Sequence, residues 1–151
     1  WHVITGYNYR MTNMQAAVGL GQLENINWHI SARRRIASLY EKYLGNNNMV
    51  KFQKVPEGYE SVYWMNNVIL QDSVKKDRDQ VMAEMEAKNI EMRPVFYPMH
   101  IMPPFYDESV KLPVAEKLAA RGISLPSHAL LSEEEVKYVC DCLKEIIGSE
   151  E

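Results

Sequence analysis

Cysteine is nearly absent from this 151-residue sequence, which contains only Cys140 and Cys142. The two lie two residues apart in a segment with helical spacing, so their side chains point about 200° away from each other. They cannot bridge to one another there, which excludes a disulfide framework. Because chains without disulfides are typical of reducing compartments, we expect a cytoplasmic protein.

The sequence also lacks long hydrophobic runs and an excess of positive charge. A membrane-spanning helix needs roughly 20 apolar residues in a row, and the apolar runs here are far shorter, so we expect no membrane partner. With 17 Lys and Arg against 20 Asp and Glu, the net charge is −3. This charge disfavours nucleic acid as a partner, and the basic residues 33–35 are better explained as a solvated helix face.

Several functional motifs are absent. The sequence contains no phosphate-binding loop, no dinucleotide-binding glycine pattern and no G-x-S-x-G nucleophile motif. The histidines lack the spacing of metal ligands, which predicts no metal site. They are His2, His29, His100 and His128. The first residue is Trp1, with neither an initiator methionine nor a signal peptide, so we expect part of a longer protein.

What is present begins with a helical pattern over residues 13–44. Thr12 and Gln15 match a capping box, which predicts a helix that starts directly after Thr12. Apolar residues then recur at helical spacing until Gly45 and three asparagines, which predict the end of the pattern.

This pattern is long for one globular helix, so we expect a bend or break at residues 25–29. Gly19 and Gly21 lower the helix propensity of its first half by about 1 kcal/mol each. They indicate that another backbone approaches this helix closely, from something outside this chain.

The remainder alternates between short strands and helices. Strands are predicted at residues 50–55, 61–70, 92–96 and 123–125. Helices are predicted at residues 74–89 and 114–121 and from Ser132 onward. Four prolines interrupt residues 97–113, where we expect an ordered functional loop. The order of elements predicts an α+β fold with a small, mostly antiparallel sheet covered on one face.

Residues 6–13 could bind an anion. They are rich in hydrogen-bonding groups and come just before a helix N-terminus, where free amides and the helix dipole favour phosphate. Alternatively, Thr12 only caps the helix and Arg10 only forms a surface ion pair.

Residues 93–100 form a second candidate site. Arg93, Tyr97 and His100 lie on a proline-stiffened segment that could hold a phosphorylated or nucleotide-linked substrate. Alternatively, the tyrosine and histidine are ordinary core or interface residues with satisfied hydrogen bonds.

Together these segments resemble one known family. The resemblance rests on GYNYRMTNMQAAVGL at residues 6–20, QLE at 22–24, RRIA at 34–37, RPVFYPMH at 93–100, PPFY at 103–106 and SLPSH at 124–128. The sequence is similar to the DegT/DnrJ/EryC1/StrS family of nucleotide-sugar aminotransferases, which depend on pyridoxal 5'-phosphate (PLP). Within the family it looks most like perosamine-synthase-type members, which aminate the 4-keto carbon of a nucleotide-linked 6-deoxy sugar with glutamate.

The resemblance implies the C-terminal portion of a fold-type I aminotransferase. Residues 1–26 would end the large PLP-binding domain, and residues 27–151 would form the small domain. In family members the lysine that bonds to the cofactor precedes the Gly-Tyr-Asn-Tyr-Arg run, and here that place lies before Trp1. A fragment without this lysine would be inactive alone, and no catalytic residue is expected within the chain.

The resemblance also assigns binding roles. Asn8 would reach across a homodimer interface to the cofactor phosphate of the partner subunit, with Arg10 near the phosphates. Tyr9 and the second candidate segment, with Arg93, Tyr97 and His100, would border the nucleotide-sugar pocket. Glutamate is implied as the second substrate. A different hypothesis is a stand-alone interaction or regulatory module of the same fold, which binds a partner chain through residues 12–44 without a cofactor.

Overall fold

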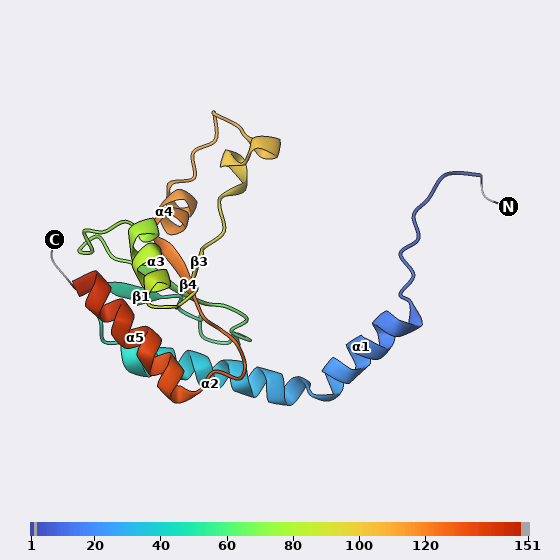
Figure 1. Cartoon of the computed structure of the whole chain (residues 1–151). Helices are drawn as coiled ribbons and strands as arrows, with labels where there is room; N and C mark the ends of the chain where they lie inside the picture. The colour runs from blue at the N-terminus through green and yellow to red at the C-terminus, as the bar shows by residue number, and fades with distance from the viewer. Residues whose placement is uncertain (2, 149–151) are drawn as a thin grey trace.

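The computed structural model describes residue 1 and residues 3–148. An extended N-terminal arm (residues 3–12) leads into helices and strands whose bounds are as follows (Figure 1). In chain order they are α1 (Asn13–Glu24), α2 (Ile26–Leu44), β1 (Val50–Phe52), β2 (Asn66–Leu70), α3 (Arg78–Ala87), β3 (Arg93–Pro94), the 3-10 helices η1 (Met99–Ile101) and η2 (Pro103–Phe105), α4 (Pro113–Arg121), β4 (Gly122–Leu125) and α5 (Glu133–Gly148).

The four strands form one sheet in the order β1-β2-β4-β3, and every pair is antiparallel. This confirms the predicted α+β class and antiparallel sheet. Val68 of β2 lies opposite Phe52 and Ile123 in the register, so these three side chains share one face of the sheet. That face packs on α2, α3 and α5 in a single hydrophobic cluster. Its fully buried members include Ile36, Tyr40, Leu44, Val68, Val81, Met85, Ile123, Val136 and Leu143.

Helix α4 lies outside this cluster and is fastened to the end of the sheet. Arg121 donates hydrogen bonds to the carbonyl oxygens of Leu70, Gln71 and Val74 at 2.7, 2.5 and 3.1 Å. The helix runs directly into β4 at Gly122, where a Cβ atom would lie 2.5 Å from the Leu118 carbonyl oxygen. Only glycine fits this junction without displacing backbone.

The long helical pattern breaks where expected. Asn25 separates α1 from α2, and the predicted capping box of Thr12 and Gln15 is present. The other predicted box is present as well, since the Ser132 hydroxyl accepts a hydrogen bond from the Glu135 amide and the Glu135 carboxylate accepts one from the Ser132 amide.

Other boundaries were wrong, for local reasons. The helix predicted over residues 74–89 starts only at Arg78, because Asp77 and Gln80 form a capping box there. The strand predicted over residues 61–70 is confined to β2, because Tyr63 has a φ of 46°, outside the extended region. The strands predicted at residues 50–55 and 92–96 shrink to β1 and β3. The proline-interrupted segment is not wholly irregular, since it contains η1 and η2.

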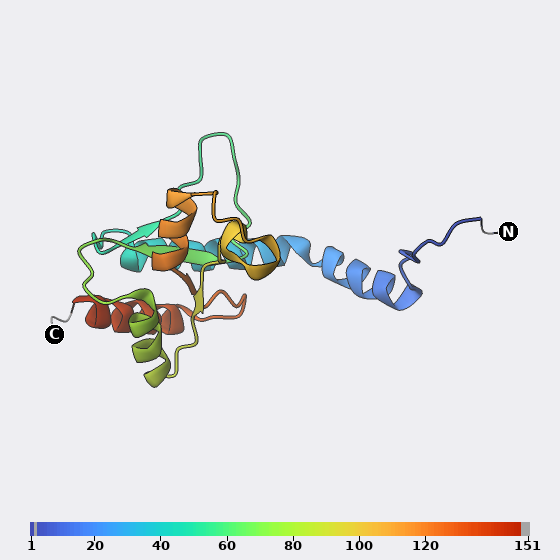
Figure 2. The same cartoon turned by 90° about the horizontal axis from the view of Figure 1, so that it is seen from above.

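Helix α1 extends away from the rest of the chain, as both views show (Figure 2). None of its residues is buried. A Cβ atom at Gly19 or Gly21 would meet nothing within 4 Å. The close backbone approach predicted at these glycines therefore remains a prediction about something outside this chain.

Cys140 and Cys142 are both buried free thiols. Burial raises the pKa of the Cys140 thiol to about 12, so it is protonated at neutral pH. In the described part of the chain, no helix has the length and apolar character needed to cross a bilayer.

Candidate functional site

The N-terminal arm presents Asn8, Tyr9 and Arg10 on an exposed strand of chain. The Asn8 Oδ1 atom accepts a hydrogen bond from the Arg10 backbone amide at 3.0 Å, so the side chain folds the arm into a local turn. Since the oxygen is engaged, the Nδ2 group of Asn8 is left to donate outward. The arm thus offers an amide donor and a guanidinium two residues apart.

The charge of this region is one-sided. Residues 1–23 contain no Asp or Glu, and Arg10 is their only Arg or Lys. No carboxylate in this stretch competes for the Arg10 guanidinium, which is also the side chain best suited to grip a phosphate with two parallel bonds. The arm therefore has the chemical groups that an anion-binding element would need.

The second candidate segment starts on β3. Arg93 is 77% exposed along its side chain and makes an ion pair with Glu91 at 3.2 Å. Phe96 meets Trp64 edge to face with ring centroids 6.3 Å apart, and both are more than half exposed. This end of the sheet therefore presents a cation next to an aromatic surface.

Tyr97 is held by Arg78, the first residue of α3. The guanidinium lies 5.6 Å from the centre of the Tyr97 ring and donates a long hydrogen bond of 3.5 Å to its hydroxyl. Arg78 is itself only 7% exposed, whereas Tyr97 is 53% exposed. Tyr97 thus has a buried cation behind it and solvent in front.

His100, on η1, is held by Glu116 of α4. Its Nε2 atom lies 2.9 Å from a Glu116 carboxylate oxygen that also accepts a hydrogen bond from the Leu112 amide. These two bonds, the amide first, lower the pKa of Glu116 below its ordinary value. Among the described residues, the Nδ1 atom of His100 is the one buried side-chain polar atom with no hydrogen-bond partner.

The sequence did not point to Arg78 or Glu116. Each acts on a residue far away in the sequence, and the two pairs are separated by 19 and 16 residues. These spacings match no helix or strand period, so only the folded chain reveals the two contacts.

The structure does not bring the two candidate segments together. The arm extends away from the sheet, while the second candidate segment lies beside α4 on the globular body, well separated from the arm (Figures 1 and 2). A complete site that used both segments would need a second copy of the chain or another partner.

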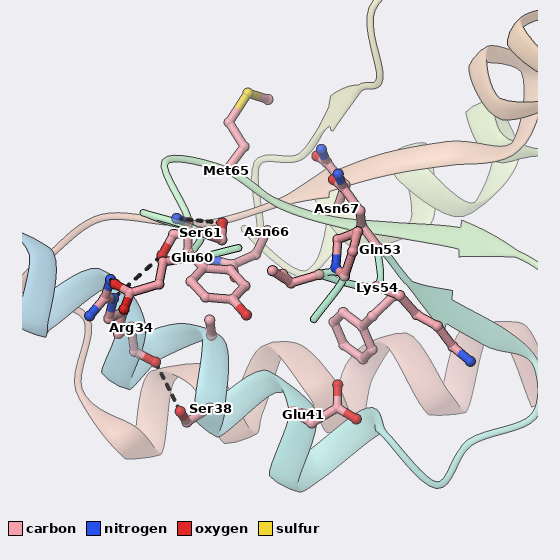
Figure 3. Close-up of a pocket in the computed structure, with 15 residues that line it drawn as sticks. Arg34, Ser38, Glu41, Gln53, Lys54, Glu60, Ser61, Met65, Asn66 and Asn67 are labelled. Atoms are coloured by element: carbon pink, nitrogen blue, oxygen red, sulfur yellow. Dashed lines mark hydrogen bonds and ion pairs between the residues drawn. The ribbon is translucent and has the colours of Figure 1, made fainter. Parts of the chain in front are cut away.

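A cavity of about 700 Å³ lies apart from both segments. Figure 3 shows it between α2 and the loop that joins β1 to β2, with Gln53 and Asn67 on the wall opposite Ser38. An ion pair of Arg34 and Glu60, at 2.6 Å, closes one end. None of the predicted site residues lines this cavity.

Metal-ligating side chains do not gather in groups of three within residues 1 and 3–148. His2, one of the four histidines considered above, lies outside the described residues.

Comparison with known proteins identifies the family. A sequence model of the DegT/DnrJ/EryC1/StrS aminotransferase family matches residues 1–144. The chain belongs to this family. Its sequence is 42% identical over 145 residues to GDP-perosamine synthase of Escherichia coli O157:H7. This alignment covers 96% of this chain and 39% of the relative. It is also 42% identical over 149 residues to GDP-perosamine synthase of Caulobacter vibrioides, covering 97% and 40%.

Solved structures agree with the fold. A DegT/DnrJ/EryC1/StrS aminotransferase from Brucella abortus is 29% identical with a TM-score of 0.79, over 93% of this chain and 37% of that one. GDP-4-keto-6-deoxy-D-mannose-3-dehydratase of Escherichia coli, solved with hydrated PLP, is 24% identical with a TM-score of 0.80. This match covers 94% of this chain and 38% of that one. The chain therefore spans about two fifths of these relatives and has the fold of that part. The cofactor indicated for the family is PLP.

The donor set of the arm fits one part of that cofactor. The phosphate of PLP is a dianion near neutral pH, and Asn8 Nδ2 with the Arg10 guanidinium supplies donors that no nearby carboxylate occupies. The arm thus suits the phosphate group.

Proposed function

We propose that this chain is the C-terminal part of a PLP-dependent aminotransferase that transfers an amino group from glutamate to a nucleotide-linked 4-keto-6-deoxy sugar. The single observation that carries the proposal is the 42% identity to GDP-perosamine synthases along nearly the whole chain. That alignment covers the arm as well as the segment with Arg93, Tyr97 and His100.

The arm would act in trans, in a homodimer. Asn8 would donate its Nδ2 hydrogens, and Arg10 its guanidinium, to the cofactor phosphate bound by the partner subunit. Two observations support this role: the donors are exposed, and a single chain leaves them far from its own sheet. By the same reasoning, residues 1–26 belong with the large domain and residues 27–151 form the small domain.

The remaining site residues would bind the nucleotide sugar. Arg93 would exchange its exposed pairing with Glu91 for a substrate phosphate, because a bidentate bond to a dianion is stronger than a surface ion pair. Because the arm acts in trans, Tyr9 would contact the substrate that is bound by the other subunit. Tyr97 and His100, in the segment that lies beside α4, would line the same pocket.

When bound, PLP supplies the electron sink that lets protons move between carbon atoms. In this proposal the lysine that carries the cofactor lies before Trp1, so the 151 residues alone are inactive. In this proposal the chain contributes the donors that bind the cofactor phosphate and the residues that line the nucleotide-sugar pocket.

The test uses protein expressed from the complete reading frame. After incubation with PLP and reduction with borohydride, the modified lysine is located by peptide mass mapping. A pyridoxyl-lysine before Trp1, together with amino transfer from glutamate to a GDP-4-keto-6-deoxy sugar, is the expected result. The 151-residue chain assayed in parallel should show no transfer.

Other outcomes would overturn the proposal. If no lysine is labelled, or if the label lies within residues 1–151, the proposed position of the cofactor-binding lysine before Trp1 is wrong. The finding would then favour a non-catalytic module that binds a partner through α1, whose residues are all unburied.

A further inference from the structure

Arg78 is a buried cation whose contacts converge on one candidate substrate residue. Its Nη1 donates to the Ala119 carbonyl oxygen at 2.5 Å, and its Nε pairs with Asp79 at 2.8 Å. Its Nη2 reaches the Tyr97 hydroxyl at 3.5 Å, and its plane lies 5.6 Å from the Tyr97 ring centre. One side chain thus joins α3, the last turn of α4 and the segment that follows β3.

A guanidinium donates hydrogen bonds and accepts none. In the Arg78–Tyr97 contact the tyrosine oxygen must therefore be the acceptor, and its own hydrogen points elsewhere. The ring is 53% exposed, so that hydrogen can reach a ligand on the solvent side. Arg78 thereby occupies an acceptor position of the hydroxyl oxygen and leaves the hydroxyl hydrogen free to donate to a ligand.

We propose that Arg78 is a positioning residue that holds the Tyr97 hydroxyl as a hydrogen-bond donor to an oxygen acceptor of the substrate. This inference rests on the proposed function and gives Tyr97 a chemical role in it. On a nucleotide-linked keto sugar, the phosphate oxygens and the keto oxygen are acceptors of this kind.

The surrounding contacts keep the geometry rigid. Three residues beyond Tyr97, His100 is tied to Glu116 at 2.9 Å, so the chain is pinned on α4 at a second point. Helix α4 is in turn fastened to three carbonyl oxygens by Arg121. Tyr97 is therefore set in place before ligand binds, which lowers the entropy cost of binding.

The experiment is a double-mutant cycle in the complete protein, with Arg78→Met, Tyr97→Phe and the double variant. Each single variant should raise KM for the nucleotide sugar, or lower kcat/KM, by about tenfold, because each removes the oriented donor. The double variant should lose no more than the worse single variant, since both act through the same hydroxyl. Tyr106→Phe, an exposed tyrosine of the same segment, is the matched control and should change neither value.

Inhibition by GDP, which carries the phosphates of the substrate but no keto sugar, separates the two acceptors. If Tyr97 donates to a phosphate oxygen, the inhibition constant of GDP should rise in Tyr97→Phe together with KM. If it donates to the keto oxygen, the inhibition constant should stay constant while kcat falls. Either outcome supports the inference, and unchanged KM, kcat and GDP inhibition in Tyr97→Phe would overturn it.

A structural role for Arg78 gives a different pattern. Loss of the Ala119 bond lowers the melting temperature, and its kinetic effect would persist undiminished when Tyr97 is already Phe. Such additivity would overturn the inference. Arg78→Lys keeps the charge but lacks the planar guanidinium whose separate nitrogens reach the three partners, so it should recover part of the stability while the KM defect remains.

Failure of the proposed function is distinguished by two controls. Wild-type amino transfer is measured first, and its absence removes the substrate role of Tyr97 along with that function. The contact itself is tested in the 151-residue chain by tyrosine-ring NMR, where Arg78→Met should shift the Tyr97 signals and leave those of Tyr106 unchanged.

Discussion

Asn8 shapes the arm and also offers a donor, and these two tasks use different atoms of its amide. The oxygen accepts from the Arg10 backbone amide, and the nitrogen can donate to a ligand. An aspartate at this position could keep the turn, because its carboxylate also accepts from the amide, but it would present negative charge to a phosphate. The two roles can therefore be separated by substitution.

We predict that Asn8→Ala lowers the affinity of the complete protein for PLP by about tenfold or more, because a hydrogen bond to a charged group is lost. Asn8→Asp should lower it further, since charge repulsion is added although the turn is retained. The measurement is a PLP titration followed by absorbance. Asn13→Ala, an exposed amide at the start of α1, is the control, and equal affinity in wild type and both Asn8 variants would contradict the assignment.

At the scale of residues, the sequence predicts candidates that lie close together along the chain, whereas contacts between distant residues appear only in the structure. Asn8, Arg93, Tyr97 and His100 could be predicted as site residues because they lie in contiguous segments that resemble a family, and their roles stay predictions. Arg78 was missed because a burial-driven contact between distant residues leaves no periodic signature. The polarity of a hydroxyl is likewise invisible until its neighbour is known.

At the scale of elements, Arg121 makes three of the hydrogen bonds that hold α4 against the body of the molecule. Arg121→Ala would leave the carbonyl oxygens of Leu70, Gln71 and Val74 without their charged donor. We predict a loss of about 2 kcal/mol in the free energy of unfolding, measured by urea denaturation. Lys117→Met removes a surface pair with Asp72 whose side chains are 60% and 75% exposed, and should cost clearly less than Arg121→Ala, because an exposed ion pair contributes little to stability. Similar losses in the two variants would show that α4 is not anchored by Arg121.

We expect the contact between α2 and α5 to weaken in acid. Lys42 and Tyr43 donate hydrogen bonds to Glu133 at 2.7 and 2.6 Å, which lowers the pKa of Glu133 below its ordinary value. A carboxyl whose folded pKa is lowered stabilises the fold above its unfolded pKa of about 4.3, and that contribution disappears as pH falls through the folded value.

Glu133→Gln should therefore reduce the loss of stability between about pH 5 and pH 3, because glutamine does not titrate. Thermal unfolding at low salt across this range measures the effect. Glu134→Gln, one residue further along the first turn of α5, should leave the acid dependence close to that of wild type. The prediction fails if the two variants have the same pH profile.

Element boundaries were predictable where the signal was local. Helix starts are predicted by capping boxes, each of which spans only four residues of chain. The two examples are Thr12 with Gln15 and Ser132 with Glu135. Asp77 with Gln80 carries the same signal but lies inside an amphipathic pattern that suggested an earlier start. The length of β2 was not predictable, because its extent depends on pairing with β4, which begins only where α4 ends.

For the whole molecule, the arm and α1 add surface but no core. No residue of α1 is buried, and several of its large apolar side chains are exposed, including Met14, Val18, Leu20 and Leu23. A free-standing helix of 12 residues is marginal in water. Exposed apolar side chains in a row favour association.

We predict that the free energy of unfolding of a chain that starts at Asn25 differs from that of the 151-residue chain by less than about 0.5 kcal/mol, because the core cluster stays intact. The shorter chain should also associate less at a given concentration. Urea denaturation and sedimentation velocity measure the two effects. A large loss of stability would mean that α1 supports the body, contrary to its exposure.

The route from β3 to β4 leaves the sheet and returns to nearly the same point. The Val95 amide donates to the Gly122 carbonyl oxygen at 3.0 Å, so the two ends of the intervening segment are tied together at the sheet. The register of β3 against β4 therefore does not depend on the length of the exposed loop between them. Relatives can differ in that loop while the sheet stays the same.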